Sequence, residues 1–220
     1  MAELIPIDGL GAGLVKKADD EERRLKSGQL SLMLQHKFGS KLRFNLLTKN
    51  IEVDGERLSL PEFELKHVAL SEKGWEIGAN PCRDAISYAA QLNSYNPIKD
   101  YLEWLAESDV EPFDLDHVAS YLIGTNDPLY DAMMKATLIG AVARIFEPGC
   151  KVDTCCVLKG QQGIKKSTFW ESLASPDWFC DTHQDDEKDW ILAVHRCWFF
   201  EEQELEYTVG KVAAGKLKGR

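Results

Sequence analysis

One short segment of the sequence has residue types and spacing that suit phosphate binding. Residues 160–168 read GQQGIKKST, with an apolar run before them and a helical pattern, FWESLA, after them. A loop that enters a helix N-terminus presents unpaired backbone N–H groups to phosphate oxygens. Gly160 and Gly163 allow the backbone to approach such a ligand closely. The segment therefore predicts a Walker A-type loop between a strand and a helix.

The polar side chains of this loop match the needs of a nucleotide and its metal ion. Lys166 is expected to place its ammonium on the β- and γ-phosphates, and Ser167 its hydroxyl on Mg²⁺. We therefore predict that ATP and Mg²⁺ are the ligands. The predicted cofactor-binding residues are Gly160, Gly163, Lys165, Lys166, Ser167 and Thr168.

Lys165 departs from the pattern G-x-x-x-x-G-K-[ST], which has glycine at this position. A side chain here clashes if the backbone needs a positive φ. Alternatively, the loop relaxes slightly and gains a second cation near the phosphates. A deviant loop with a signature lysine near its start is excluded, because that position holds Gln161. The competing interpretation is a basic helix start that binds nothing.

An acidic segment downstream could complete such a site. Residues 194–206 read VHRCWFFEEQELE, in which the apolar run Cys197–Phe200 ends at Glu201. This pattern is typical of a Walker B strand, whose acid holds the water shell of Mg²⁺. Ser167 and Glu201 are therefore the predicted metal-binding residues. The predicted catalytic residues are Glu201, Glu202 and Glu204, of which Glu202 would polarise the attacking water and Glu204 competes for that role. The alternative is an ordinary buried strand that leads into an acidic helix.

These groups need a strand and helices to position them. The run DTCCVLK at residues 153–159 is expected to form a buried strand. Before it, Asp127 and Pro128 are a favourable start for an apolar helix that ends at Pro148-Gly149 and should be largely buried. A shorter helical segment runs from Phe113 to Gly124. We predict an α/β fold with a helical connector at 109–150 and a P-loop NTPase core at 151–220.

The chain before residue 109 reads as a tail or linker (1–28) and a small α+β N-terminal unit (29–108). A short helix, QLSLMLQHKF, precedes alternating residues that suggest a hairpin, broken near Thr48–Asn50. The pair Asp54-Gly55 marks another turn. The segment CRDAISYAAQLNSY has helical periodicity, and Pro97 can occupy the first turn of the next helix.

Composition restricts the partners. The formal net charge of −10 repels nucleic acid from the chain as a whole, so any DNA contact needs a local basic patch. Such a patch near the hairpin combines lysines and an arginine with aromatic residues, although a solvated hairpin face is the favoured interpretation. The patch comprises Lys37, Phe38, Lys41, Arg43, Phe44 and Lys49, and the C-terminal basic residues are Lys211, Lys216, Lys218 and Arg220.

The six cysteines indicate reduced thiols, because no CxxC spacing occurs. Cys180, His183, His195 and Cys197 have the spacing C-x2-H-x11-H-x-C, which matches no common zinc site. We instead expect His195 and Cys197 in or near a buried strand. No apolar run is long enough for a membrane span and no signal peptide is recognisable, so a cytoplasmic location without membrane contact is the default expectation.

The run AVARIFEPGCKVDTCCVLKGQQGIKKSTFWESLA, together with CWFFEEQELE, resembles the virulence-associated protein E family of phage-, plasmid- and island-borne replication proteins. The likeness spans about residues 35–206. It implies an ATPase similar to superfamily 3 helicases of the AAA+ class, which form hexamer-like homo-oligomeric rings on single-stranded or forked DNA. By this resemblance Gly160, Gly163, Lys166 and Ser167 bind ATP and Mg²⁺. Glu201 and Glu204 match the two Walker B glutamates, and Lys165 replaces the usual glycine.

Two main functions follow as expectations. The first is the nucleotide-binding part of a phage- or plasmid-type DNA replication helicase, similar to primase-helicases. The alternative is a truncated, non-hydrolysing accessory or interaction module with a vestigial P-loop. A small-molecule kinase is disfavoured because only Arg196 lies between the two motifs, too few for an arginine-bearing lid. Superfamily 3 cores continue to a sensor strand and an arginine finger, which cannot be assigned in these residues. We therefore expect nucleotide binding rather than efficient hydrolysis from this chain.

Overall fold

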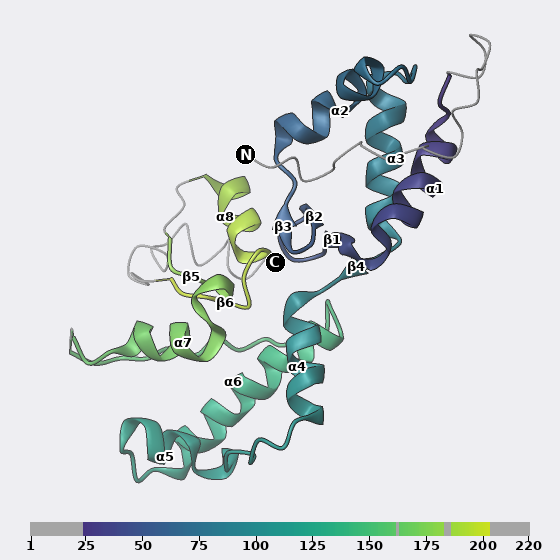
Figure 1. Ribbon diagram of the computed structural model, residues 1–220. Coiled ribbons are helices and arrows are strands. Elements are labelled where there is room, and N and C mark those ends of the chain that lie inside the picture. The colour runs from purple at the N-terminus through teal and green to yellow at the C-terminus, as the bar shows by residue number, and fades with distance from the viewer. Residues whose placement is uncertain (1–23, 162, 183–185, 203–220) are drawn as a thin grey trace. The chain divides into compact units, whose positions relative to one another are not determined.

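The computed structural model describes residues 24–161, 163–182 and 186–202 (Figure 1). The chain divides into two compact units, residues 1–97 and 98–220. Each unit combines helices with a small sheet, so the expected mixture of helix and sheet is confirmed. Among the described residues, no helix is both long enough and apolar enough to cross a bilayer.

The first unit contains a mixed four-stranded sheet in the order β3-β2-β1-β4. β1 and β2 are antiparallel with Leu42 opposite Val53, so the predicted hairpin is confirmed. The side-chain oxygen of Asn45 accepts hydrogen bonds from the backbone N–H groups of Leu47 (2.9 Å) and Thr48 (3.1 Å), which shapes the connecting turn. The strands are β1 (Leu42–Asn45), β2 (Ile51–Val53), β3 (Glu56–Arg57) and β4 (Ser94–Tyr95).

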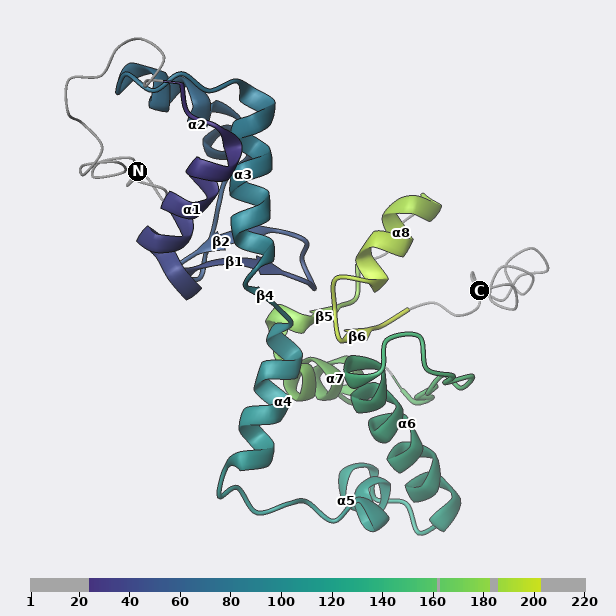
Figure 2. The ribbon, with the colours of Figure 1, turned by 90° about the vertical axis from the view of Figure 1, so that its right-hand side faces the viewer.

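Two helices, α1 and α3, pack against this sheet, and α2 packs against α3. α1 and α3 lie side by side, and their apolar faces form the core of the unit (Figure 2). Leu25 is buried in the same core, so the packed part of the unit begins before residue 29. α2 starts at a capping box in which Ser59 and Glu62 exchange hydrogen bonds. The helices are α1 (Ser27–Phe38), the short 3-10 turn η2 (Gly39–Lys41), α2 (Leu60–Glu72) and α3 (Ala79–Gln91).

The second unit begins within α4 and carries the predicted phosphate loop. Pro97 lies in the first turn of α4, and the Asp127 side chain caps α6 by accepting a hydrogen bond from Leu129 N at 2.9 Å, both as predicted. The helices are α4 (Pro97–Glu107), η3 (Leu115–His117), α5 (Val118–Ile123), α6 (Pro128–Phe146), α7 (Lys166–Ala174), η4 (Pro176–Trp178) and α8 (Glu187–Val194). The strands β5 (Phe179–Cys180) and β6 (Phe199–Phe200) form a parallel pair.

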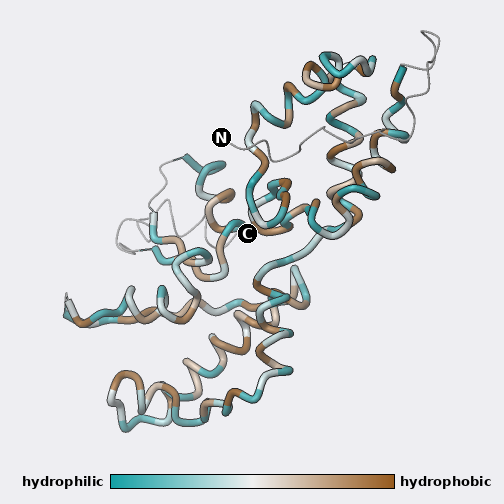
Figure 3. The backbone as a smooth tube through the Cα atoms, viewed as in Figure 1, coloured by the Kyte–Doolittle hydropathy of each residue, from teal (hydrophilic) through white to brown (hydrophobic). Residues whose placement is uncertain are grey.

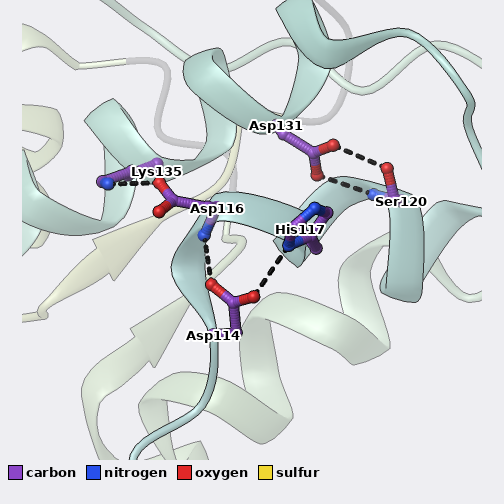
Figure 4. Close-up of polar contacts among 6 residues, drawn as sticks. All are labelled: Asp114, Asp116, His117, Ser120, Asp131 and Lys135. Carbon is purple, nitrogen blue, oxygen red and sulfur yellow. Dashed lines mark hydrogen bonds and ion pairs between the residues drawn. The ribbon is translucent and has the colours of Figure 1, made fainter.

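Polar contacts fasten η3 and α5 to α6 (Figure 4). Asp131 of α6 accepts hydrogen bonds from the backbone N–H (2.8 Å) and the hydroxyl (2.6 Å) of Ser120. These two bonds hold the pKa of Asp131 below its usual value. In the same area Asp114 contacts the ring of His117 at 2.7 Å. Bonds to charged groups are directional, so they define how α5 sits on α6.

The prediction that α6 is largely buried is wrong for the described residues. Its apolar residues Leu129, Met133 and Ile139 each have at least half of their surface exposed. α6 contacts α5 and η3, and Figure 3 shows hydrophobic residues along its length. High apolar content predicted burial along the whole helix, whereas only Asp131, Met134 and Gly140 of α6 are buried.

The predicted strand at residues 153–159 is also wrong, because these residues have no regular secondary structure. Cys156 and Leu158 pack against the cluster around Met134 and Trp170, while the intervening Val157 is exposed. The segment thus alternates like a strand. A strand needs backbone hydrogen bonds to a neighbouring strand, and no described strand pairs with this segment.

Candidate functional site

The predicted phosphate loop leads directly into α7, which begins at Lys166. Helix geometry leaves the first backbone N–H groups of α7, from Lys166 to Thr168, without acceptors inside the helix. Gly163 has a positive φ of 86°, a conformation that side chains rarely adopt. The helix predicted after the loop is therefore present, whereas the strand predicted before it is not.

Gly160 has a steric role in this loop. A Cβ atom at this position would lie 2.5 Å from Cδ1 of Ile164. Such a distance is well inside van der Waals contact, so a larger residue would have to displace the Ile164 side chain. Glycine at position 160 therefore lets Ile164 fold back over the start of the loop.

Lys165 adopts the left-handed conformation, with φ 62° and ψ 33°, and it is the N-cap residue of α7. The positive φ that the sequence raised as a difficulty for this lysine is therefore present. A residue with a Cβ atom in this region costs on the order of 1 to 2 kcal/mol relative to the right-handed form. Its side chain is exposed. The loop thus carries local strain at the position where the P-loop pattern has glycine.

Lys166 closes the loop on itself. Its ammonium donates hydrogen bonds to the backbone carbonyl oxygens of Gly160 (3.1 Å) and Gln161 (2.9 Å). These contacts place the positive charge of Lys166 across the loop, between its first residues and the start of α7. The ammonium of Lys166 is therefore held by the first residues of the loop.

Ser167 and Glu201, the two predicted metal-binding residues, are in direct contact. The hydroxyl of Ser167 donates a hydrogen bond to Oε1 of Glu201 at 2.7 Å, although the residues are 34 positions apart. Glu201 directly follows β6, and its backbone N–H donates to the carbonyl of Cys180 at the end of β5 (2.8 Å). The parallel strand pair thus delivers the carboxylate to the first turn of α7, beside which both strands lie (Figures 1 and 2).

The second carboxylate oxygen of Glu201 is buried and has no hydrogen-bond partner in the described structure. A buried, unpartnered polar atom is costly, and most such atoms in folded proteins are satisfied by protein, water or an ion. Carboxylate and hydroxyl oxygens are the ligands that a hard cation such as Mg²⁺ prefers. The donor chemistry of Ser167 and Glu201 therefore fits a metal ion or its water shell.

The other predicted acids are less closely placed. Oε2 of Glu202 accepts a hydrogen bond from the indole N–H of Trp190 in α8, at 3.3 Å. Glu204 lies outside the described residues, so the choice between Glu202 and Glu204 stays a prediction. Thr168 is exposed in the first turn of α7. The contact of Trp190 with Glu202 was not predicted, since one tryptophan in an apolar helix gives no signal of contact with an acid.

The alternative zinc ligands do not form a site in the described structure. Apart from the undescribed residues, which include His183, no group of three or more His, Cys, Asp or Glu side chains has metal-binding geometry. Cys197 lies half-buried just before β6, and burial raises its pKa to about 12. His195 is exposed at the C-terminal end of α8. All six cysteines are free thiols.

The basic residues of the hairpin are engaged within their own unit. Lys41 forms an ion pair with Asp54 at 3.0 Å, and Arg43 stacks 4.0 Å above the ring of Tyr95. Phe38 is buried in the core and therefore offers no stacking surface. These contacts favour the solvated-face interpretation of the hairpin. The predicted basic tail, residues 211–220, lies outside the described part of the chain.

The region that contains the loop and Glu201 matches the model of a known protein family. The model of the virulence-associated protein E-like domain matches residues 102–220, which is more than half of the chain. The chain belongs to the virulence-associated protein E-like family. The matched region of this VapE-like protein contains the loop, α7, both strands and Glu201. A comparison with curated proteins finds no match.

Proposed function

We propose that this VapE-like chain binds ATP together with Mg²⁺ at residues 160–168, as the nucleotide-binding part of a phage- or plasmid-type DNA replication helicase. The observation that carries the proposal is the contact between Ser167 and Glu201 at the start of α7, with Oε2 of Glu201 buried and unpartnered. A helix start that binds no ligand would leave this buried carboxylate oxygen without a partner, which is energetically costly.

Different residues of the site would bind the phosphates and the metal ion. The first N–H groups of α7 and the ammonium of Lys166 would hold phosphate oxygens, for which Lys166 exchanges its bonds to the carbonyls of Gly160 and Gln161. Ser167 and Glu201 would hold Mg²⁺ or its water ligands. When bound, the ion neutralises phosphate charge. A hexamer-like ring on single-stranded or forked DNA is the assembly that matches this function.

A non-hydrolysing module remains the second candidate, and a specific contact favours it. The carboxylate of Glu202 accepts a hydrogen bond from Trp190, which holds it toward α8. A general base has to lie within hydrogen-bond distance of the water that it activates. If Glu202 keeps this contact with nucleotide bound, it would not act as the base, and hydrolysis would depend on Glu204.

Titration calorimetry with Mg²⁺-ATP tests the proposal. We expect binding by the unmodified chain and a loss of at least about tenfold in affinity for Lys166→Ala, since one charged contact contributes on this order. Lys188→Ala is the matched control, because Lys188 is in α8 and outside the loop. If titration of the unmodified chain with Mg²⁺-ATP gives no binding signal, the proposal of nucleotide binding is refuted. Phosphate release by the same protein separates the helicase from the non-hydrolysing module.

A further inference from the structure

Positive charge is concentrated in and just before the loop, despite the acidity of the chain. Residues 154–170 contain three lysines, Lys159, Lys165 and Lys166, and no Asp or Glu, whereas the whole chain has a net charge of −10. The first turn of α7 has no acidic residue either. Cations at a helix N-terminus face the positive end of the helix dipole, which is an unfavourable arrangement. An anion bound at the same place would interact favourably with both the lysines and the helix dipole.

The two adjacent lysines differ in what they contact. The ammonium of Lys166 is bound by the carbonyls of Gly160 and Gln161. Lys165 is exposed, and its ammonium has neither a hydrogen bond nor an ion pair within the described structure. It nevertheless occupies a left-handed conformation, with φ 62°, that glycine would adopt without strain. A strained residue with a free charge next to a predicted ligand site indicates a role in that site.

We infer that Lys165 is a specificity-determining residue that supplies a second ammonium to the phosphate chain of the nucleotide. Lys166 and the helix start would hold the phosphates that ADP and ATP share, whereas Lys165 strengthens binding in proportion to the charge of the terminal phosphates. The site therefore selects triphosphates over diphosphates more strongly than a loop with glycine at this position. This inference rests on the proposed function of the loop.

The test separates the charge of Lys165 from its backbone strain. Lys165→Asn removes the charge but keeps a residue that tolerates the left-handed region, Lys165→Gly removes both charge and strain, and Lys165→Arg keeps the charge. Lys159→Gln is the matched control, because it removes an exposed lysine that precedes the loop. For each variant, affinities for ATP, ADP and AMP are measured with Mg²⁺, and circular dichroism confirms folding.

We expect the ratio of ATP to ADP affinity to fall by about fivefold to tenfold in Lys165→Asn and Lys165→Gly, as for the loss of one charged contact. Lys165→Arg and Lys159→Gln should keep the ratio within about twofold. The effect should shrink at high salt, because the contact is exposed.

An unchanged ratio in Lys165→Asn and Lys165→Gly would overturn the inference while leaving nucleotide binding intact. If Lys165→Gly binds ATP more tightly but has the ATP-to-ADP affinity ratio of the unmodified chain, the lysine only strains the loop. Failure of the unmodified chain to bind any of the three nucleotides would instead refute the proposed function, and the inference with it.

Discussion

The indole of Trp170 stacks on the ring of Phe199, with the ring centroids 5.2 Å apart and the ring planes inclined by 26°. Trp170 lies one turn after Lys166 in α7, and Phe199 lies in β6, two residues before Glu201. The stack therefore joins the helix that carries Ser167 to the strand that carries its acidic partner. The hydrogen bond between Ser167 and Glu201 depends on this packing for its alignment.

Truncation of Trp170 should destabilise the second unit and disrupt the site together. Trp170→Ala removes a buried aromatic side chain, for which the expected loss is about 3 to 5 kcal/mol in the free energy of unfolding. Urea denaturation followed by circular dichroism measures it. Trp104→Ala is the control, since Trp104 is 61% exposed and should change stability by about 1 kcal/mol or less. Equal losses in the two variants would contradict the importance of the stack.

Glu201→Gln should affect stability and binding in opposite directions. The substitution neutralises a carboxylate whose Oε2 is buried without a partner, so the free protein should be as stable as the unmodified chain or slightly more stable. If the proposed metal site is correct, Mg²⁺ should lose most of its effect on ATP affinity, which titrations with and without Mg²⁺ measure. Ser167→Ala should show the same loss of Mg²⁺ dependence. A variant that retains the full dependence would exclude Glu201 from the metal site.

The cysteines should react with alkylating reagents in an order set by burial. Burial raises the pKa of Cys82 to about 11 and that of the half-buried Cys197 to about 12, so both thiols stay protonated near neutral pH. Cys155 is exposed. Brief treatment with iodoacetamide at about pH 8 should modify Cys155 first, because the thiolate is the reactive form. Peptide mass spectrometry reports the order, and unfolding in urea should abolish it. Early modification of Cys197 in the folded protein would contradict its burial.

The contact between His117 and Asp114 predicts a pH-dependent contribution to stability. Asp114 raises the pKa of His117 above its ordinary 6.5, with smaller contributions from Asp131 and Asp116, and this stabilisation is lost as pH rises through the raised value. His117 lowers the pKa of Asp114 below its ordinary 3.8, with Lys135 contributing, and that stabilisation is lost as pH falls through the lowered value. Both contributions are therefore present between about pH 3.8 and 6.5.

His117→Gln measures this contribution. The difference in unfolding free energy between the unmodified chain and the variant should be largest near pH 5 and should shrink by about pH 9, when the imidazole is neutral. The effect should be small because the pair is exposed and screened by solvent and salt. A difference that does not vary with pH would show that His117 acts only through packing.

Local signals in the sequence predicted the features that depend on neighbouring residues. Asp127 and Pro128 start a helix because the cap and the fixed proline φ act within one turn, and the hairpin follows from alternation over a few residues. Burial of α6 and pairing of residues 153–159 depend instead on what lies alongside them, which no local pattern encodes. For the same reason the placement of Glu201 beside Ser167 was inferred from motif order, not from the sequence around either residue.

β5 and β6 run parallel, so the chain must cross from the end of one to the start of the other, and α8 lies in that crossover. Ser167 and Glu201 can meet only after this crossover has closed. A ligand that requires both residues would therefore bind the folded crossover and not the open one, and would stabilise it by mass action. Protection of the α8 amides from hydrogen exchange would then rise with ligand concentration, even though α8 contributes no predicted ligand. The stability of α8 would then be linked to occupancy of the loop.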